Sequence, residues 1–432
     1  MLKSNEKYTF ALEKGTALVT FAFKERVRKV IVHSLKEKGA ILVSDATLRE
    51  GEQMPGVSFS PQEKLSIARK LEEAGVHSIN AGFPISSREE FETVCLVAQG
   101  LRRAIVTALA RAREEDIDKA ARALEGLSRR KAGVSIFLGT SPIHRKFKLE
   151  KTPEEILEIA RSSVKYARKY FDIVSFAAED ASRTEPEFLF QIYEEAISAG
   201  ASGIGFADTT GFATPKTMTT FIKGINENVK NIRDALLAVH CHNDLGLATA
   251  NTLAAVAAGA NIVQCTVNGI GERAGNAALE EVVMALKVHS DEFGVKVRFD
   301  STKLSSLSEM VARLTRIPIW PYKPIVGDNV FATEAGIHQA GILKAQETYL
   351  IFDPREVGAQ SPELLLGKHI GRHFLKFKLE EAGFDLSEIE LKQALDRLRR
   401  LADKKASISD TDLKEIAQNI ISRRPEGKGP GA

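Results

Sequence analysis

The stretch Leu236-Leu237-Ala238-Val239-His240-Cys241-His242-Asn243-Asp244 changes from apolar to polar residues along its length. Its short apolar start is typical of a strand that is buried on both faces of a parallel sheet. In a (β/α)8 barrel, functional side chains gather at the carboxyl ends of such strands. The stretch therefore predicts a buried barrel strand that leads directly into an active site.

Seven further apolar runs alternate with helical patterns along the chain. They are Ile41–Val43, His77–Asn80, Ala104–Thr107, Val134–Phe137, Asp172–Phe176, Gly203–Phe206 and Asn261–Gln264. Successive runs start 25–38 residues apart, which suits one βα unit each. Eight such units predict an α/β fold, a (β/α)8 TIM barrel, although the alternation alone leaves an open, doubly wound sheet as an alternative.

Helix signals fill the intervals between these runs. The segment Gln62–Leu71 repeats apolar residues on one stripe, with charged residues opposite. Ser60 and Thr152 each precede a proline, which is the pattern of a capping residue followed by proline in the first turn. These signals predict helices over residues 62–71, 153–170 and 251–258.

The chain divides into five expected segments. A basic leader over residues 1–40 precedes the barrel, which we expect over 41–290. An irregular, proline-containing and Gly/His-rich subdomain follows over 291–375. Leu391, Leu395, Leu398 and Leu401 recur at helical spacing and predict a small helical subdomain over 376–422. Residues 423–432 should form a frayed tail.

Composition narrows the class of protein. The 60 Lys and Arg residues nearly balance the 57 Asp and Glu residues, so the net charge of +3 is no footprint for nucleic acid. No apolar run approaches the ~20 residues needed to cross a bilayer, and the N-terminus lacks the apolar core of a signal peptide. Three cysteines are too few for a disulfide framework. We expect a cytoplasmic protein without a nucleic-acid or membrane partner.

The polar ends of two runs predict a metal site. His240 and His242 alternate on an extended segment, so both imidazoles point to the same side. Together with a carboxylate such as Glu50, they would form a divalent-metal site with positions open for substrate. The neighbouring Arg49 suits a substrate carboxylate. Hydrogen-bonded strand-end histidines and an ordinary Arg-Glu surface pair are the simpler alternatives.

A glycine-rich turn follows the last run. Asn276 is expected to open a helix just after this turn, which contains Gly269 and Gly271. Glycine permits close backbone approach, and a helix N-terminus favours anions such as coenzyme phosphates. A tight turn with a helix cap explains the same residues equally well.

Three motifs together resemble the metal-dependent TIM-barrel acyltransferases and lyases: Asp45–Gln53, His240–His242 and Asn268–Asn276. This superfamily contains isopropylmalate, homocitrate and citramalate synthases, Re-type citrate synthase and hydroxymethylglutaryl-CoA lyase. Gly327–Gln339 and Leu366–His373 resemble the C-terminal subdomains of the synthases, which the lyases lack. The resemblance implies an enzyme of amino-acid biosynthesis that condenses acetyl-CoA with a 2-oxo acid and hydrolyses the CoA thioester.

The resemblance also implies roles for single residues. A divalent metal (Mn, Mg, Zn or Co) would be held by Glu50, His240 and His242, with Asn276 close by. Contacts with the 2-oxo acid would come from Arg49, Gln53 and Thr209. Acetyl-CoA would meet a loop containing Gly271, Glu272 and Arg273. Catalysis would use Arg49, Glu179 and His338, and His338 is expected to come from the partner chain of a homodimer.

The choice of 2-oxo acid depends on several departures from family patterns. Glu50 stands where isopropylmalate synthases usually carry Asp, and Glu179–Arg183 resembles homocitrate synthases linked to nitrogenase cofactor assembly. The chain also ends before the regulatory domain of many isopropylmalate synthases. Against a dicarboxylic substrate, Ser175 replaces the Arg that grips the distal carboxylate in lysine-pathway homocitrate synthases, and Ala340 replaces a commonly acidic or polar residue.

Homocitrate synthase acting on 2-oxoglutarate is therefore the leading expectation. The alternatives are Re-type citrate synthase acting on oxaloacetate and a short isopropylmalate or citramalate synthase. A retro-Claisen lyase would leave residues 290–422 without a purpose. A non-catalytic metal-binding scaffold would not need Arg49, Glu179 and His338 together.

Overall fold

The computed structural model describes residues 32, 36, 39–360, 363–405 and 407–424, which divide into two compact units. The first unit runs to Ser301 and includes Leu307–Pro318, and the second comprises Thr302–Ser306 and the residues from Ile319 onward. The leader expected over 1–40 and the tail expected over 423–432 lie mostly outside the described residues. The domain boundaries expected at residues 290 and 375 stay predictions.

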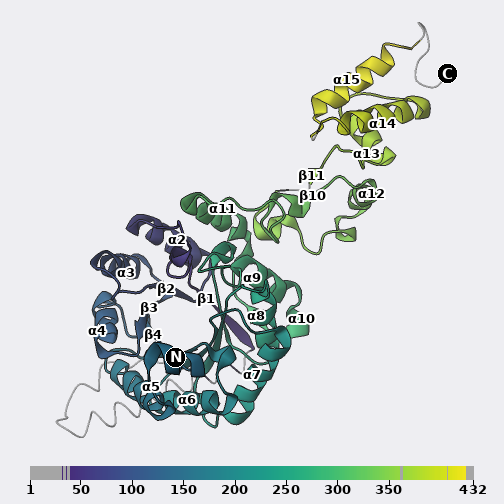
Figure 1. Ribbon diagram of the computed structural model, residues 1–432. Coiled ribbons are helices and arrows are strands. Elements are labelled where there is room, and N and C mark those ends of the chain that lie inside the picture. The colour runs from purple at the N-terminus through teal and green to yellow at the C-terminus, as the bar shows by residue number, and fades with distance from the viewer. Residues whose placement is uncertain (1–31, 33–35, 37–38, 361–362, 406, 425–432) are drawn as a thin grey trace, which may run out of the picture. The chain divides into compact units, whose positions relative to one another are not determined.

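The first unit is a closed parallel barrel (Figure 1). Its strands are β1 (Ala40–Asp45), β2 (Ser78–Gly82), β3 (Ile105–Arg111), β4 (Ala132–Gly139), β5 (Ile173–Glu179), β6 (Gly203–Asp208), β7 (Leu236–Cys241) and β8 (Ile262–Cys265). Because β1 pairs in parallel with both β2 and β8, the ring has no open edge. The predicted TIM barrel is confirmed, and the open sheet is excluded. A short strand β9 (Lys296–Val297) also pairs with β1.

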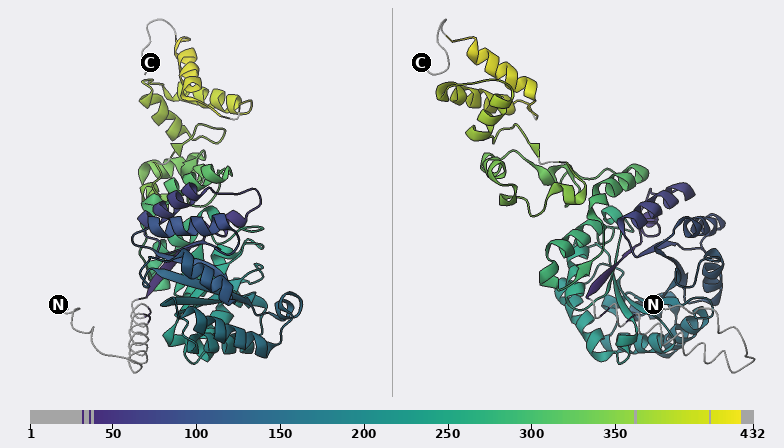
Figure 2. Two further views of the ribbon diagram at one scale, coloured as in Figure 1. Left: turned by 90° about the vertical axis from the view of Figure 1, so that its left-hand side faces the viewer. Right: turned by 180° about the vertical axis from the view of Figure 1, so that it is seen from behind.

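Helices surround the strands, as Figure 2 shows from two further sides. They are α2 (Pro61–Ala74), α3 (Arg88–Gly100), α4 (Glu114–Ala123), α5 (Pro153–Ala167), α6 (Pro186–Ser198), α7 (Pro215–Asn228), α8 (Ala248–Ala257), α9 (Leu279–Val288), α10 (Ser290–Phe293) and α11 (Leu304–Thr315). Ser60 and Thr152 each accept a hydrogen bond from the third helical residue, whose glutamate returns one to the cap. The predicted starts of α2 and α5 are thus confirmed and have a physical cause.

The strands have two distinct sides. Partners in register on parallel strands point to the same side of the sheet. From His240 the register runs through Gln264 and Ser44 to Ser78, and this side lines the interior of the barrel, called the lumen below. The alternate residues, such as Val239 and Cys241, are fully buried apolar side chains on the side that the helices cover.

From Ile319 onward, the described residues of the second unit form a short two-stranded sheet and the α-helices α12 to α15. The strands β10 (Ala332–Thr333) and β11 (Glu363–Leu364) pair in parallel, a pairing that the sequence did not predict. The helices are α12 (Gly336–Lys344), α13 (Arg372–Glu381), α14 (Glu388–Ala402) and α15 (Asp410–Ile421). Leu391 and Leu398 of α14 are buried in a core shared with α13 and α15, and Leu395 and Leu401 pack against it. No helix in the described residues is long and apolar enough to span a membrane.

Candidate active site

The three predicted metal ligands meet at the carboxyl-terminal mouth of the barrel. His240 Nε2 lies 3.1 Å from His242 Nε2 and 3.5 Å from Glu50 Oε1. The three residues can each offer one ligand atom within 4.8 Å of the others. Among the described residues they form the one such group of His, Cys, Asp or Glu side chains. The fold therefore assembles the predicted set from the ends of β1 and β7.

Burial sets the charge of this cluster. It lowers the pKa of His240 to about 3 and lowers the pKa of His242 as well, so both imidazoles stay neutral. Burial alone would raise the pKa of Glu50, but the positive charge of Arg49 and the hydrogen bond that it donates leave this pKa below its usual value. Two neutral imidazoles and one carboxylate form a donor set that suits a divalent cation.

Unpartnered polar atoms around the cluster fit the same ion. Glu50 Oε2 and Asn276 Oδ1 are buried and have no hydrogen-bond partner in the part of the chain that the structure describes, although buried polar atoms are normally paired. Asn276 can enter because residue 271 is glycine: a Cβ there would lie 2.0 Å from Asn276 Nδ2. Two oxygen donors thus remain available for a cation beside the histidines.

Asn276 itself does not open a helix, and this part of the prediction was wrong. Helix α9 begins at Leu279, and Asn276 forms an antiparallel bridge with His242. The Asn276 N–H donates to Gly269 O and the Ala277 N–H to Cys241 O. These extended-chain bonds tie the segment to the end of β7 and explain why the helix starts later.

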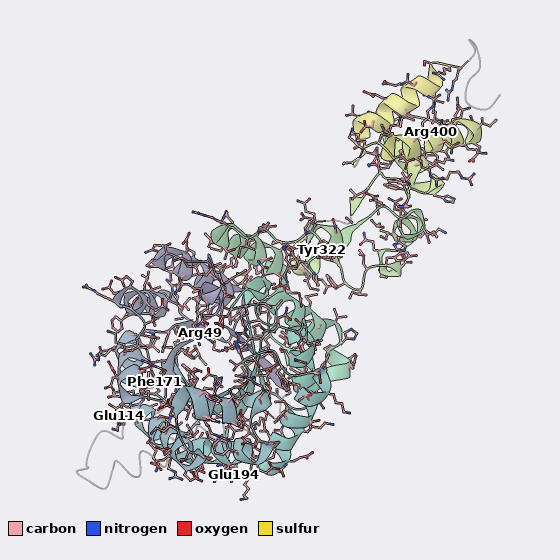
Figure 3. The ribbon with its side chains drawn as sticks, in the orientation of Figure 1. Arg49, Glu114, Phe171, Glu194, Tyr322 and Arg400 are labelled. Carbon is pink, nitrogen blue, oxygen red and sulfur yellow. The ribbon has the colours of Figure 1, made fainter. Side chains whose placement is uncertain are left out.

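The predicted contacts with the 2-oxo acid occupy different places at the mouth. Arg49, labelled in Figure 3, is only 12% exposed. It binds Glu50 and lies 3.5 Å from Gln264 Oε1. Thr209 follows β6 and accepts a hydrogen bond from the Asp180 N–H. Gln53 is exposed in the short helix η1 (Gly51–Gln53). The roles of all three in substrate binding stay predictions.

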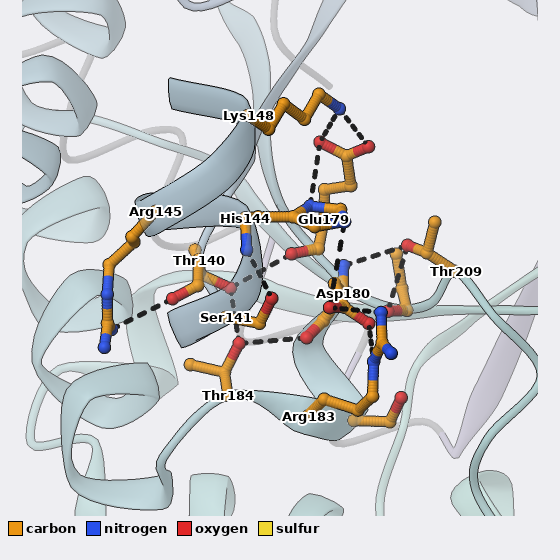
Figure 4. Close-up of polar contacts among 12 residues, drawn as sticks. Thr140, Ser141, His144, Arg145, Lys148, Glu179, Asp180, Arg183, Thr184 and Thr209 are labelled. Carbon is orange, nitrogen blue, oxygen red and sulfur yellow. Dashed lines mark hydrogen bonds and ion pairs between the residues drawn. The ribbon is translucent and has the colours of Figure 1, made fainter. Parts of the chain in front are cut away.

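Glu179 ends β5 within a polar cluster (Figure 4). Lys148 Nζ lies 2.6 and 2.8 Å from its two oxygens, and His144 Nδ1 lies 3.7 Å from Oε2. Burial raises the pKa of Glu179, but the nearby His144 and the hydrogen bonds from Lys148 outweigh burial and leave this pKa below its usual value. The carboxylate is therefore ionised and able to accept a proton.

Sequence reasoning missed His144 and Lys148. Both lie on η2 (His144–Leu149), a π-helical turn that follows β4. The sequence identifies polar residues after β1, β5, β6, β7 and β8, and the same rule applied to β4 identifies these two. Glycine at position 139 leaves room for the His144 side chain, because a Cβ there would lie 2.9 Å from His144 Cβ.

The residues predicted to meet acetyl-CoA lie in the loop after β8. Glu272 and Arg273 are exposed, and Gly271 is buried beneath them. The Arg273 guanidinium donates to both Asp244 oxygens at 2.8 and 2.9 Å and to Thr209 O at 2.7 Å. Arg273 thus joins the loops after β6, β7 and β8, while its contact with coenzyme stays a prediction.

His338 belongs to the second unit. It is exposed on α12, and its ring centre lies 4.1 Å from that of Tyr349. Its predicted role in catalysis, and its origin from a partner chain, stay predictions.

Known proteins resemble the chain over nearly all of its length. Residues 40–311 match the HMGL-like family, and residues 325–406 match a family described as homocitrate synthase post-HMGL domain-like. A protein named 2-isopropylmalate synthase from Pyrococcus furiosus is 47% identical over 90% of this chain and 77% of its own length. A protein of the same name from Halothermothrix orenii is 46% identical over 88% of this chain and 74% of its own.

Solved structures share the barrel. An HMG-CoA lyase from Bacillus subtilis has a TM-score of 0.56 at 19% identity and covers 65% of this chain and 95% of its own. At this identity the likeness shows the fold alone. The family matches and the relatives confirm the predicted superfamily: the chain belongs to the HMGL-like family of Claisen-condensing TIM-barrel enzymes and is an acyltransferase of the class that uses acetyl-CoA and a 2-oxo acid.

Proposed function

We propose that the chain condenses acetyl-CoA with 2-oxoisovalerate to give 2-isopropylmalate, the activity named for its relatives. The observation that carries this choice is the charge of the lumen. Along the eight described strands, Arg111 is the one lumen-facing lysine or arginine, and Asp116 already binds its guanidinium at 2.7 and 2.9 Å. The distal carboxylate of 2-oxoglutarate would be buried there without a free cation, at a cost of several kcal/mol.

Apolar residues that face the lumen on β3, β4 and β5 favour a 2-oxo acid with an apolar side chain. Leu109, Phe137 and Ala177 face the lumen on β3, β4 and β5, as the register of these strands requires. An isopropyl group can pack against such a wall, and each buried methyl or methylene group contributes about 0.8 kcal/mol. The expected preference for 2-oxoglutarate is not confirmed, and the isopropylmalate alternative takes its place.

The side chains have matching chemical tasks. A divalent cation bound by Glu50, His240 and His242 would polarise the ketone of the 2-oxo acid. The Arg49 guanidinium binds the C1 carboxylate, which fixes the ketone carbon in position. The ionised Glu179 accepts a proton from the acetyl methyl group, and that carbon then bonds to the ketone carbon. The ketone oxygen gains a proton, and water cleaves the thioester to release the CoA thiol.

A thiol-release assay with acetyl-CoA and a panel of 2-oxo acids tests the proposal. The panel comprises 2-oxoisovalerate, pyruvate, oxaloacetate and 2-oxoglutarate, with products identified by mass. We expect kcat/KM for 2-oxoisovalerate to exceed the others by at least ~10-fold. A higher value for 2-oxoglutarate would restore homocitrate synthase, and no thiol release with any acid would contradict the condensing activity itself.

A further inference from the structure

Asn80 is a buried amide without a partner. It is 1% exposed, and neither Nδ2 nor Oδ1 has a hydrogen-bond partner among the described residues. A buried amide that leaves its donors and acceptor unused destabilises the folded state. Such a group is retained at a cost to stability, which is common where a ligand completes the missing bonds.

The register places this amide in the lumen beside Arg49. Asn80 pairs with Thr107 on β3, and it is the next lumen-facing residue after Ser78 on β2. Ser78 is level with Ser44, whose hydroxyl accepts from the same Gln264 side chain that Arg49 approaches. Arg49 and Asn80 therefore face one sector of the lumen, formed by β8, β1 and β2.

The neighbouring charges indicate what would bind there. Arg49 Nε is a second buried donor to which no described residue offers an acceptor, so the sector offers N–H groups from a guanidinium and from an amide. An anion with more than one acceptor oxygen satisfies both, and a carboxylate has this form. The side chains of Leu109, Phe137 and Ala177 lie on other strands, where the one lumen-facing guanidinium, that of Arg111, is already bound to Asp116.

We propose that Asn80 binds the C1 carboxylate of the 2-oxo acid, with Nδ2 donating to one oxygen beside Arg49. An amide supplies this hydrogen bond without adding charge. An acidic residue at position 80 would compete with the substrate for Arg49 and would repel its carboxylate. This assignment rests on the proposed function only in requiring that the substrate is a 2-oxo acid.

Binding and stability together test the assignment on the metal-loaded protein. Asn80→Leu, which keeps four side-chain heavy atoms in a similar branched shape, removes the amide. We expect its Kd for 2-oxoisovalerate, measured by calorimetry without acetyl-CoA, to rise about 10- to 100-fold, as for loss of a hydrogen bond to a charged group. Its thermal midpoint should equal or exceed that of the wild type. Asn80→Asp should weaken binding further, and Asn80→Ala repeats the test if Asn80→Leu does not fold.

Asn251 provides a matched control. This buried amide on α8 donates to Ala213 O at 2.8 Å, a bond that serves the fold. Asn251→Leu should lower the thermal midpoint and leave the Kd unchanged. Wild-type affinity in Asn80→Leu or Asn80→Ala would mean that Asn80 holds a buried water and would overturn the assignment. A wild-type protein that binds no 2-oxo acid would instead contradict the proposed function.

Discussion

Arg49 shows how one side chain can serve two partners at the barrel mouth. It binds Glu50 in the structure, yet its buried Nε remains without a partner. A guanidinium has five donors in a rigid plane, so it can hold the neighbouring carboxylate and a substrate carboxylate together. Lysine keeps the charge but cannot do both.

Arg49→Lys should therefore impair the 2-oxo acid step. Breaking a desolvated charge pair costs ~2–5 kcal/mol, or roughly 30-fold to several-thousand-fold in binding or rate. Saturation kinetics for the 2-oxo acid at fixed acetyl-CoA measure the effect. If turnover and half-saturation both change less than about threefold, Arg49 only pairs with its neighbour at the rim.

Asp45 makes stability depend on pH. Burial raises its pKa from 3.8 to about 7, although hydrogen bonds from the Thr47 N–H and hydroxyl act in the opposite direction. Because the folded protein binds this proton more tightly than the unfolded chain, the free energy of unfolding falls as pH rises from about 4 to about 7. Asp45→Asn should reduce the loss between pH 5 and pH 7.5 by about 2–3 kcal/mol in urea unfolding. Parallel profiles for the two proteins would show that Asp45 does not titrate in this range.

Helix α2 supports the mouth through one buried cation. Lys64 is 1% exposed and binds Glu52 at 2.6 Å and Glu90 at 2.7 Å. These carboxylates also accept the Phe59 and Phe83 N–H groups, which lie in the loops after β1 and β2. One side chain of α2 thus fixes the loop that carries Arg49 and Glu50 and the loop that follows Asn80.

Lys64→Met should leave two carboxylates without their cation and destabilise the fold by about 3–5 kcal/mol. The exposed Lys223 on α7 is the control, and Lys223→Met should change the free energy of unfolding by less than ~0.5 kcal/mol. Urea unfolding compares the two variants. An equal, small effect of both would show that solvent reaches Lys64 and screens its pairs.

The sequence predicted the strands of the barrel better than it predicted the side-chain contacts at its mouth. All eight apolar runs became strands, because the side chains that face the surrounding helices must be apolar to pack against them. The His240–His242 pair was recognisable because strand alternation alone puts both rings on one side. His144 and Asn80 were missed since their significance depends on a turn folding inward and on the absence of a partner, neither of which is a sequence pattern. The prediction for Asn276 was wrong because the sequence pattern of a helix start does not show that extended backbone hydrogen bonds to other segments can replace the first turn of the helix.

The proposed metal site and the single tryptophan lie in different units of the chain. All three proposed metal ligands lie in the first unit, while Trp320, the single tryptophan, is exposed in the second. A cation that binds only the folded barrel stabilises it by ~2.7 kcal/mol at 100 times its Kd. Two spectroscopic probes can distinguish this stabilisation of the barrel from any change in the stability of the second unit.

Chelation should lower the thermal midpoint followed by circular dichroism, which reports mainly the barrel helices. The midpoint followed by Trp320 emission should stay unchanged. His242→Ala, which lacks one ligand, should show no response to the chelator by either probe. No shift with either probe in the wild type would contradict the metal site, whereas equal shifts with both probes would show that the two units unfold together.

The two-sided strands described above also bear on how such a protein changes over time. Residues such as Ser135, Ser175 and Ala177 face the lumen, whereas their sequence neighbours Val134, Ile136, Val174, Phe176 and Ala178 are buried on the helix-covered side. A substitution on the lumen side changes which substrate fits the barrel. A substitution on the helix-covered side changes the stability of the barrel itself. Evolution and engineering can thus change the substrate specificity of this enzyme one lumen-facing residue at a time, without altering the residues that stabilise the barrel.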